Sequence, residues 1–136
     1  MDHFKSINDN YGHPAGDAAL QGAAELIASA VRTADIACRY GGEEFAVLMP
    51  ETPPDKAQAL CDRIRESIGA RDWPSHPDRK ITVSIGVCGS EGSAGLTPQQ
   101  WLAHADAALY RSKEGGRTRV VVTKVGKDGP KLAAAS

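Results

Sequence analysis

The chain has 136 residues, which is enough for one compact domain and too few for two. Apolar residues make up 41% of it, so a hydrophobic core can form. The 16 Lys and Arg balance 17 Asp and Glu, and any affinity for nucleotides must therefore come from a local site. The three cysteines form no Cys-x-x-Cys pair and no stretch approaches the ~20 apolar residues of a membrane span, so we expect a reduced, cytoplasmic chain.

The first half of the chain predicts a helix followed by a β-hairpin. Residues 1–5 resemble the end of a strand. Apolar residues then recur every three or four positions over 18–32, which is typical of one buried helix face, and Asp17 stands at the N-cap position. Two short apolar runs, 36–40 and 44–49, lie on either side of a Gly-Gly pair, a pattern that is typical of a β-hairpin.

The second half of the chain predicts a layered fold that mixes helices and strands. Its elements are a helix over 55–68, a loop over 69–79, a strand over 80–87, a helix over 97–113 and a strand over 119–123. Thr97, Pro98 and Gln100 form the sequence of a capping box with Pro in the first turn. Residues 124–136 are rich in Gly, Lys and Ala and lack an apolar period, so we expect a disordered tail. The element order indicates an α/β or α+β fold.

The most specific motif is Arg39-Tyr-Gly-Gly-Glu-Glu-Phe45. Glycines let the backbone approach a bulky ligand closely, and adjacent carboxylates on a tight turn favour a cationic partner. One of Glu43 and Glu44 can hold a hard cation such as Mg²⁺ while the other takes part in proton transfer. Taken alone, the segment is explained equally well as a solvated turn that happens to carry acidic residues.

A second motif lies upstream, where Asp2 to Asp9 is followed by Gly-His-Pro-Ala-Gly-Asp over 12–17. Among its polar residues, Asn8 offers an amide and Asp17 a carboxylate, and both suit the edge of a guanine base. A carboxylate accepts from the ring N–H and the exocyclic amine, and an amide can serve the carbonyl side. The alternative is a polar loop that leads into a helix, with Asp17 as a simple N-cap.

Taken in this order, the motifs resemble the GGDEF domain of diguanylate cyclases. Phe4-Lys-x-Ile-Asn-Asp-x-Tyr-Gly-His-x-x-Gly-Asp17 precedes the Gly-Gly-Glu-Glu-Phe motif. Val83-Ser-Ile-Gly-Val87 then resembles the family's late strand, and Ala105-Asp-x-Ala-Leu-Tyr-x-x-Lys113 with the following Gly-Arg pair resembles its final helix. The resemblance covers nearly the whole chain.

The resemblance implies an α/β fold with a palm-like sheet flanked by helices and the Gly-Gly-Glu-Glu-Phe motif on a β-hairpin. Residues 1–123 would be a partial GGDEF domain, and 124–136 a disordered tail. Two GTP-bound domains are expected to face each other as an antiparallel homodimer, in which each 3′-hydroxyl attacks the partner's α-phosphate. The products would be cyclic dimeric GMP and two pyrophosphates, the cofactor Mg²⁺ or Mn²⁺, and the controlling partner an upstream sensor domain.

The resemblance also implies roles for single residues. Glu44 is the candidate base, Lys5 offsets developing charge, and Glu43 with the main-chain carbonyl of Met1 holds the metal. Substrate contacts are implied for Phe4, Asn8, His13, Asp17, Gly41, Gly42, Lys113 and Arg117. These residue types suit phosphoryl transfer, which depends on positioning, metal ions and cations. For Lys113 and Arg117 the alternative is a solvated helix end whose cations favour the helix dipole.

A further match is Arg32-Thr-Ala-Asp35, which resembles the family's product-inhibition site, with Arg63 as its supporting arginine. A guanidinium can bind guanine's acceptor edge or a phosphate in a bidentate manner. An Arg-x-x-Asp pattern by itself is weak, and it commonly marks only a helix end.

The sequence departs from the family at its start, where an apolar strand ends in Asp-x-Asp. Met1 takes the middle position and Asp2 the last, so we expect the first strand and first helix to be largely missing. The expected consequences are weaker Mg²⁺ binding and a severe loss of activity. Besides a diguanylate cyclase domain, two interpretations stay open: a non-catalytic module that binds GTP or cyclic dimeric GMP, and a fragment without function. The alternative fold is a generic α/β nucleotide-binding domain.

Overall fold

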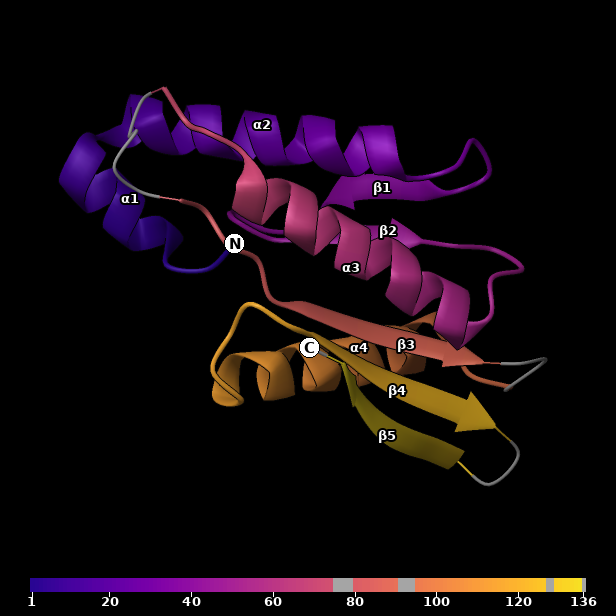
Figure 1. Ribbon diagram of the computed structural model, residues 1–136. Coiled ribbons are helices and arrows are strands. Elements are labelled where there is room, and N and C mark those ends of the chain that lie inside the picture. The colour runs from indigo at the N-terminus through magenta and orange to yellow at the C-terminus, as the bar shows by residue number, and fades with distance from the viewer. Residues whose placement is uncertain (75–79, 91–94, 127–128, 136) are drawn as a thin grey trace.

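The computed structural model describes residues 1–74, 80–90, 95–126 and 129–135. In chain order the elements are α1 (Phe4–Tyr11), α2 (His13–Ala30), β1 (Ile36–Arg39), β2 (Phe45–Leu48), α3 (Pro54–Ala70), β3 (Ile85–Ser90), α4 (Pro98–Glu114), β4 (Val120–Gly126) and β5 (Gly129–Ala135). Helices α2 and α3 lie on one side of the strands, and α4 lies behind β3 and β4 (Figure 1). The predicted mixture of helices and strands is therefore confirmed.

The described strands form two small sheets instead of one. Strands β1 and β2 pair antiparallel, with Ile36 opposite Leu48 and Arg39 opposite Phe45, so the predicted hairpin is confirmed. In the second sheet β4 lies between β3, its parallel neighbour, and β5, its antiparallel neighbour. Helix α4 connects β3 to β4, as a parallel pair requires.

The first two residues lie between the two sheets, near the label N in Figure 1. The amino group of Met1 donates to the carbonyl of Glu43 (3.0 Å), just beyond β1. The amide of Asp2 donates to the carbonyl of Thr82 (2.9 Å), in the segment that leads into β3. Met1 and Asp2 thus bridge the hairpin and the second sheet.

Three sequence-based boundaries need correction. Residues 1–5 are not the end of a strand, because α1 begins at Phe4. Its buried residues are Phe4 and Ile7, and two apolar positions are too few to predict a helix. Asp17 is not an N-cap, because α2 begins four residues earlier with Pro14 in its first turn. The strand expected from residue 80 begins only at Ile85, since residues 80–84 pair with no neighbouring strand among the described residues.

The core has two parts, one on each side of the bridge. The larger packs α1 and α2 against α3 and the segment before β3, through residues such as Ile7, Ala19, Ile68 and Ile81. The smaller packs α3 against β3 and β4. Its members are Ala57, Cys61, Val87, Val120 and Val122. Since α3 contributes to both clusters, it links the two sheets through apolar contact.

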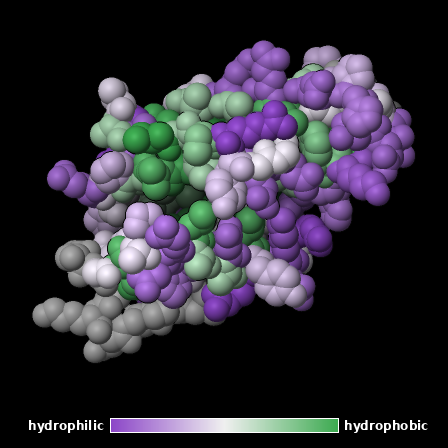
Figure 2. All heavy atoms as spheres, turned by 180° about the vertical axis from the view of Figure 1, so that it is seen from behind, coloured by the Kyte–Doolittle hydropathy of each residue, from purple (hydrophilic) through white to green (hydrophobic). Residues whose placement is uncertain are grey.

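One face of the hairpin remains apolar and exposed. The cross-strand partners Ile36 and Leu48 are 58% and 64% exposed. Figure 2 shows apolar side chains gathered on this back side of the molecule, the side that α2 and α3 do not cover. No helix in the described part of the chain is long and apolar enough to cross a membrane.

The tail expected to lack regular structure contains the end of β4 and the strand β5. The backbone of β5 pairs with the whole of β4, from Val120 opposite Ala135 to Gly126 opposite Gly129. An edge strand presents a row of free N–H and C=O groups, which accept a neighbouring strand whatever its side chains are. Backbone pairing of this kind leaves no apolar period in the sequence.

Helix α4 packs unusually close to β3. Its N-cap is Thr97, which forms the predicted capping box. The Thr97 hydroxyl accepts from the amide of Gln100, and the Gln100 side chain accepts from the amide of Thr97. A Cβ atom on Gly86 would lie 2.2 Å from the amide nitrogen of Leu109 and 2.4 Å from the carbonyl oxygen of Ala105. Both are backbone atoms, so only glycine permits this approach.

The variant Gly86→Ala is therefore expected to destabilise the fold by about 1–3 kcal/mol, because α4 must move away from β3. The control is Gly69→Ala in α3, where the added Cβ meets nothing within 4 Å. That change should raise stability by up to about 1 kcal/mol through helix propensity. Urea unfolding of both variants measures the difference, and equal midpoints for Gly86→Ala and the unsubstituted chain would contradict the close contact.

Candidate active site

The turn of the hairpin is held by its own backbone and by Arg39. The amide of Tyr40 donates to the carbonyl of Glu44 (2.8 Å), and Arg39 donates to the carbonyls of Gly41 (3.1 Å) and Gly42 (2.6 Å). A Cβ atom on Gly42 would meet nothing within 4 Å, so open space lies beside this glycine. The turn presents the two following glutamates on a fixed backbone.

Glu43 and Glu44 share their surroundings with Lys113 and the amino terminus. Burial lowers the pKa of the Met1 amino group below 8.0, while the charges of Asp2, Glu43 and Glu44 raise this pKa and that of Lys113 lowers it. Charges that shift the pKa of a buried group lie in its neighbourhood. The hairpin and the end of α4, 70 residues apart in sequence, therefore meet around Met1.

Asp2 does not join the two glutamates. Its side chain is turned toward the second sheet, where it accepts from the hydroxyls of Thr82 (2.9 Å) and Ser84 (2.6 Å). The amide of Thr118 is a third donor at 3.4 Å. This buried carboxylate is therefore engaged in the fold and does not offer its oxygens to the hairpin.

The corner between α1 and α2 brings Phe4 and Asn8 against Gly16. A Cβ atom on Gly16 would lie 1.7 Å from Oδ1 of Asn8 and 3.2 Å from Cζ of Phe4. Oδ1 of Asn8 is buried and accepts no hydrogen bond among the described residues. A buried acceptor without a donor is costly, so this oxygen requires a hydrogen-bond donor from outside the described residues. Asp17 follows directly and is exposed.

The remaining predicted contact residues come from both ends of the chain. Lys5 and His13 are exposed, on the first turns of α1 and α2. Lys113 is half-buried in the last turn of α4, where cations favour the helix dipole. Arg117 is exposed in the turn before β4, with its amide bonded to the carbonyl of Ser112 (3.0 Å).

The residues present fit a hard cation only in part. Within the described residues no group of three or more His, Cys, Asp and Glu side chains is arranged to hold a metal. Mg²⁺, however, is commonly bound by one or two carboxylates completed by substrate phosphates and water. Burial lowers the pKa of the Met1 amino group, and the carboxylates of Glu43 and Glu44 offset part of that effect, so their negative charge acts at this place. Glu43 therefore suits a metal site that phosphate oxygens complete.

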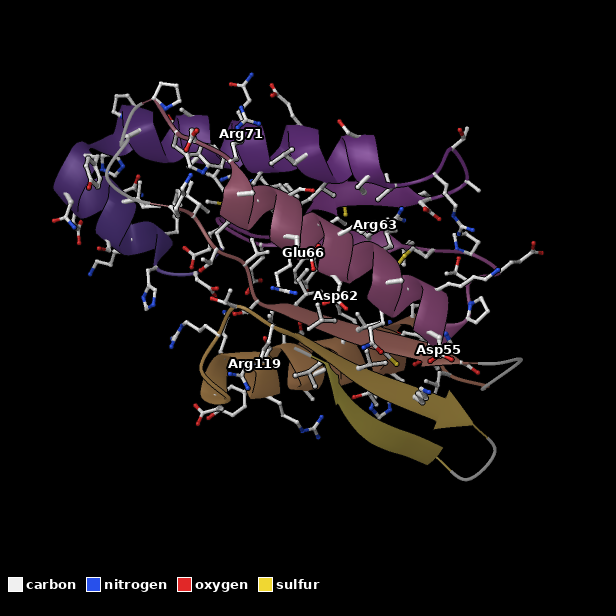
Figure 3. The ribbon with its side chains drawn as sticks, in the orientation of Figure 1. Asp55, Asp62, Arg63, Glu66, Arg71 and Arg119 are labelled. Carbon is white, nitrogen blue, oxygen red and sulfur yellow. The ribbon has the colours of Figure 1, made fainter. Side chains whose placement is uncertain are left out.

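Arg32 and Asp35 form a compact pair at the end of α2. Arg32 donates to both carboxylate oxygens (2.9 and 3.2 Å), and its guanidinium also contacts the carbonyl of Pro50 (3.3 Å) and the hydroxyl of Thr52. The Asp35 side chain is fully covered while that of Arg32 is 53% exposed. Arg63 lies exposed on α3 (Figure 3), and among the described side chains no hydrogen bond or ion pair joins it to the pair.

Two supporting residues of the site were not predicted. Arg39 binds the glycine carbonyls, and Asp2 binds donors that are 80 or more residues away in sequence. The basic residue two positions before the Gly-Gly pair was a usable signal for Arg39. For Asp2 nothing in the sequence pairs it with Thr82, Ser84 or Thr118, because that pairing depends on the tertiary fold.

Comparison with known proteins identifies the family. A family model described as "Diguanylate cyclase, GGDEF domain" matches residues 1–119. The probable diguanylate cyclase DgcT of Escherichia coli is 41% identical over 128 residues, which cover 92% of this chain and 28% of DgcT. The chain spans 33% or less of the length of the first curated relatives that it matches.

Two solved structures have the same fold. The GGDEF domain of DgcB from Caulobacter crescentus, in complex with c-di-GMP, is 37% identical with a TM-score of 0.81, over 89% of this chain and 72% of that one. The active GGEEF domain of a Vibrio cholerae diguanylate cyclase is 29% identical with a TM-score of 0.77, over 89% and 76%. The chain belongs to the GGDEF family of diguanylate cyclases, and the predicted family and fold class are confirmed.

The pair Arg32–Asp35 generates a prediction about pH. Hydrogen bonds from Arg32 hold the pKa of Asp35 below its ordinary value of 3.8. The pair's contribution to stability is therefore fully present above pH 3.8 and is lost as the pH falls through the lower pKa of the folded state. Asp35→Asn should lower the urea midpoint at neutral pH, and the difference should narrow in acid.

The control for this prediction is Asp9→Asn, which neutralises an exposed carboxylate on α1. Its midpoint should follow that of the unsubstituted chain at each pH. An Asp35→Asn deficit that stays constant from neutral pH to the most acidic pH at which the chain folds would contradict the ion pair.

Proposed function

We propose that this chain is the catalytic module of a diguanylate cyclase, which condenses two GTP into cyclic dimeric GMP and two pyrophosphates as an antiparallel homodimer. The observation that carries the proposal is the meeting of Glu43, Glu44 and Lys113 around the amino group of Met1. Phosphoryl transfer requires acidic groups and a cation near the phosphates. Here the hairpin supplies the two acids and open space beside Gly42, and α4 supplies the cation. Family membership supports the same reaction.

In the proposed reaction each half-site handles one bond exchange. The 3′-oxygen of one GTP forms a bond to the α-phosphorus of the other, the bond from that phosphorus to the bridging oxygen breaks, and pyrophosphate leaves. Glu44 takes the hydroxyl proton. Lys5, Lys113 and Arg117 offset the charge on the phosphates. A Mg²⁺ or Mn²⁺ ion held by Glu43 and the carbonyl of Met1 would add further positive charge at the phosphates.

Guanine is proposed to bind at the corner of α1 and α2. There Oδ1 of Asn8 lies buried without a donor, and a guanine N–H supplies one. The carboxylate of Asp17 accepts from the remaining ring and exocyclic N–H groups, while Phe4 and His13 flank the nucleotide. An adenine base lacks this donor pattern, so the corner should select GTP over ATP.

Product inhibition is proposed at Arg32 and Asp35, with Arg63 in support. Arg32 is half-exposed, and its Nη1 donates no hydrogen bond within the described part of the chain. Those free hydrogens are available to guanine or phosphate in cyclic dimeric GMP. A non-catalytic module that binds this dinucleotide is the alternative, and the same exposed arginine favours it.

The proposal is tested by incubating the chain with GTP and Mg²⁺ and by measuring the cyclic dinucleotide with mass spectrometry. The expected result is product from the unsubstituted chain and none from Glu44→Gln. Calorimetry should show GTP binding in preference to ATP. Absence of product together with Arg32-dependent binding of cyclic dimeric GMP would favour the binding module. Equal affinity for GTP and ATP would contradict guanine recognition.

A substitution beside Asn8 tests the guanine site directly. In Gly16→Ala the new Cβ collides with Oδ1 of Asn8, so the amide must turn out of the corner. We expect GTP affinity to fall about tenfold or more, because at least one hydrogen bond is lost. Stability should change by no more than about 1 kcal/mol, since alanine favours the helix. Gly69→Ala is the control, and equal GTP affinity in both variants would contradict the assignment of Asn8.

A further inference from the structure

The carboxylate of Asp2 joins three segments of the chain and is 5% exposed. Its Oδ1 accepts from the Ser84 hydroxyl (2.6 Å), and its Oδ2 accepts from the Thr82 hydroxyl (2.9 Å) and the Thr118 amide (3.4 Å). Its own amide donates to the carbonyl of Thr82 (2.9 Å). Such a set of bonds fixes the position of each donor relative to the amino terminus.

One of these donors belongs to the turn that carries Arg117. Arg117 and Thr118 have φ angles of 64° and 49°, in the left-handed region that non-glycine residues rarely adopt. Backbone in such a conformation persists only where its surroundings hold it. Backbone bonds to Ser112 and Lys113 hold the start of this turn, and bonds from Ser112 and Ile85 to the carbonyl of Arg119 hold its end. Between them, the Arg119 side chain donates to the carbonyl of Arg117, and the Thr118 amide donates to the side chain of Asp2. Arg119 lies beside the turn at the start of β4 (Figure 3).

The residue before Asp2 connects the same carboxylate to the acidic hairpin. The amino group of Met1 donates to the carbonyl of Glu43, so the hairpin contact and the carboxylate that holds Thr118 belong to adjacent residues. The distance from the glutamates to Arg117 is thus set through Asp2. In GTP the corresponding distance separates the reacting α-phosphate from the terminal phosphates.

We propose that Asp2 is a positioning residue. It holds the turn so that Arg117 reaches the terminal phosphates of GTP while the acidic hairpin lies at the α-phosphate. The inference rests on the proposed function, since it needs GTP as the ligand. Asp2 touches no substrate in this account and acts through Arg117.

A carboxylate is the side chain that suits this place. Its three partners are all donors here, two hydroxyls and one amide, and both carboxylate oxygens accept. In Asp2→Asn one oxygen becomes an NH₂ group, which faces a donor and leaves it without an acceptor. The variant keeps the shape of the side chain and loosens the turn.

The test compares GTP with GMP, because GMP lacks the terminal phosphates and keeps the guanine. Calorimetry is done with EDTA, so that metal binding and turnover do not contribute. Asp2→Asn should weaken GTP binding about tenfold and leave the affinity for GMP unchanged. Asp9→Asn, an exposed aspartate on α1, is the matched control and should change neither affinity. An equal loss for GTP and GMP would overturn the proposal, because it would indicate a general loss of structure.

A double-mutant cycle tests whether Asp2 acts through Arg117. In the Arg117→Ala background Asp2→Asn should cause no further loss of GTP affinity, whereas independent, multiplying effects would overturn the proposal. Ser84→Ala removes one donor to Asp2 and serves if Asp2→Asn fails to fold. It should show the same selective loss for GTP to a smaller degree, and a loss that is equal for GMP would again overturn the proposal.

Amide hydrogen exchange separates this inference from the proposed function. The Thr118 amide should exchange about tenfold faster in Asp2→Asn than in Asp9→Asn, in the absence of any nucleotide. If the unsubstituted chain binds neither GTP nor GMP, the proposed function fails, and with it the role of Asp2 toward GTP. If GTP binds and Thr118 exchanges at the same rate in both variants, the proposed function stands and the positioning role of Asp2 is overturned.

Discussion

The structure depends on the contact of Met1 and Asp2 with both sheets. Within the described residues the strands β1 and β2 do not pair with β3, and the amino-terminal residues span the space between them. Helix α3 adds apolar contact across the same boundary, since its side chains belong to both core clusters. The polar bridge fixes position and the apolar helix supplies most of the burial, because hydrogen bonds are directional and the hydrophobic effect is not.

The site follows from this arrangement. The hairpin tip, the start of α1 and the turn after α4 come from three regions of the chain, and each is joined to Met1 or Asp2 by a bond or by the chain itself. The close approach of α4 to β3 at Gly86 fixes that helix against the second sheet, and its last turn carries Lys113, whose charge acts on the Met1 amino group. The residues of the proposed GTP site therefore come from these three regions of the chain.

The sequence predicted the parts of this site that short motifs encode. The hairpin, the capping box at Thr97 and the family are confirmed, because turn and cap residues act over a few positions. It did not predict α1, because the buried residues Phe4 and Ile7 span only one turn. It also did not predict that strand pairing begins only at Ile85, because pairing depends on a neighbouring strand. The bonds of Asp2 to Thr82 and Ser84 join residues 80 and 82 positions apart, and only the folded chain shows them.

The central claim is that three segments distant in sequence form one GTP site. It is tested most directly by titrating the nitrogen-15-labelled chain with GTP and Mg²⁺ and following the amide resonances of Asn8, Gly42 and Arg117. The account predicts that all three shift together and fit a single dissociation constant, while amides in the middle of α3 stay unchanged. Shifts confined to one segment, or three different constants, would contradict a shared site.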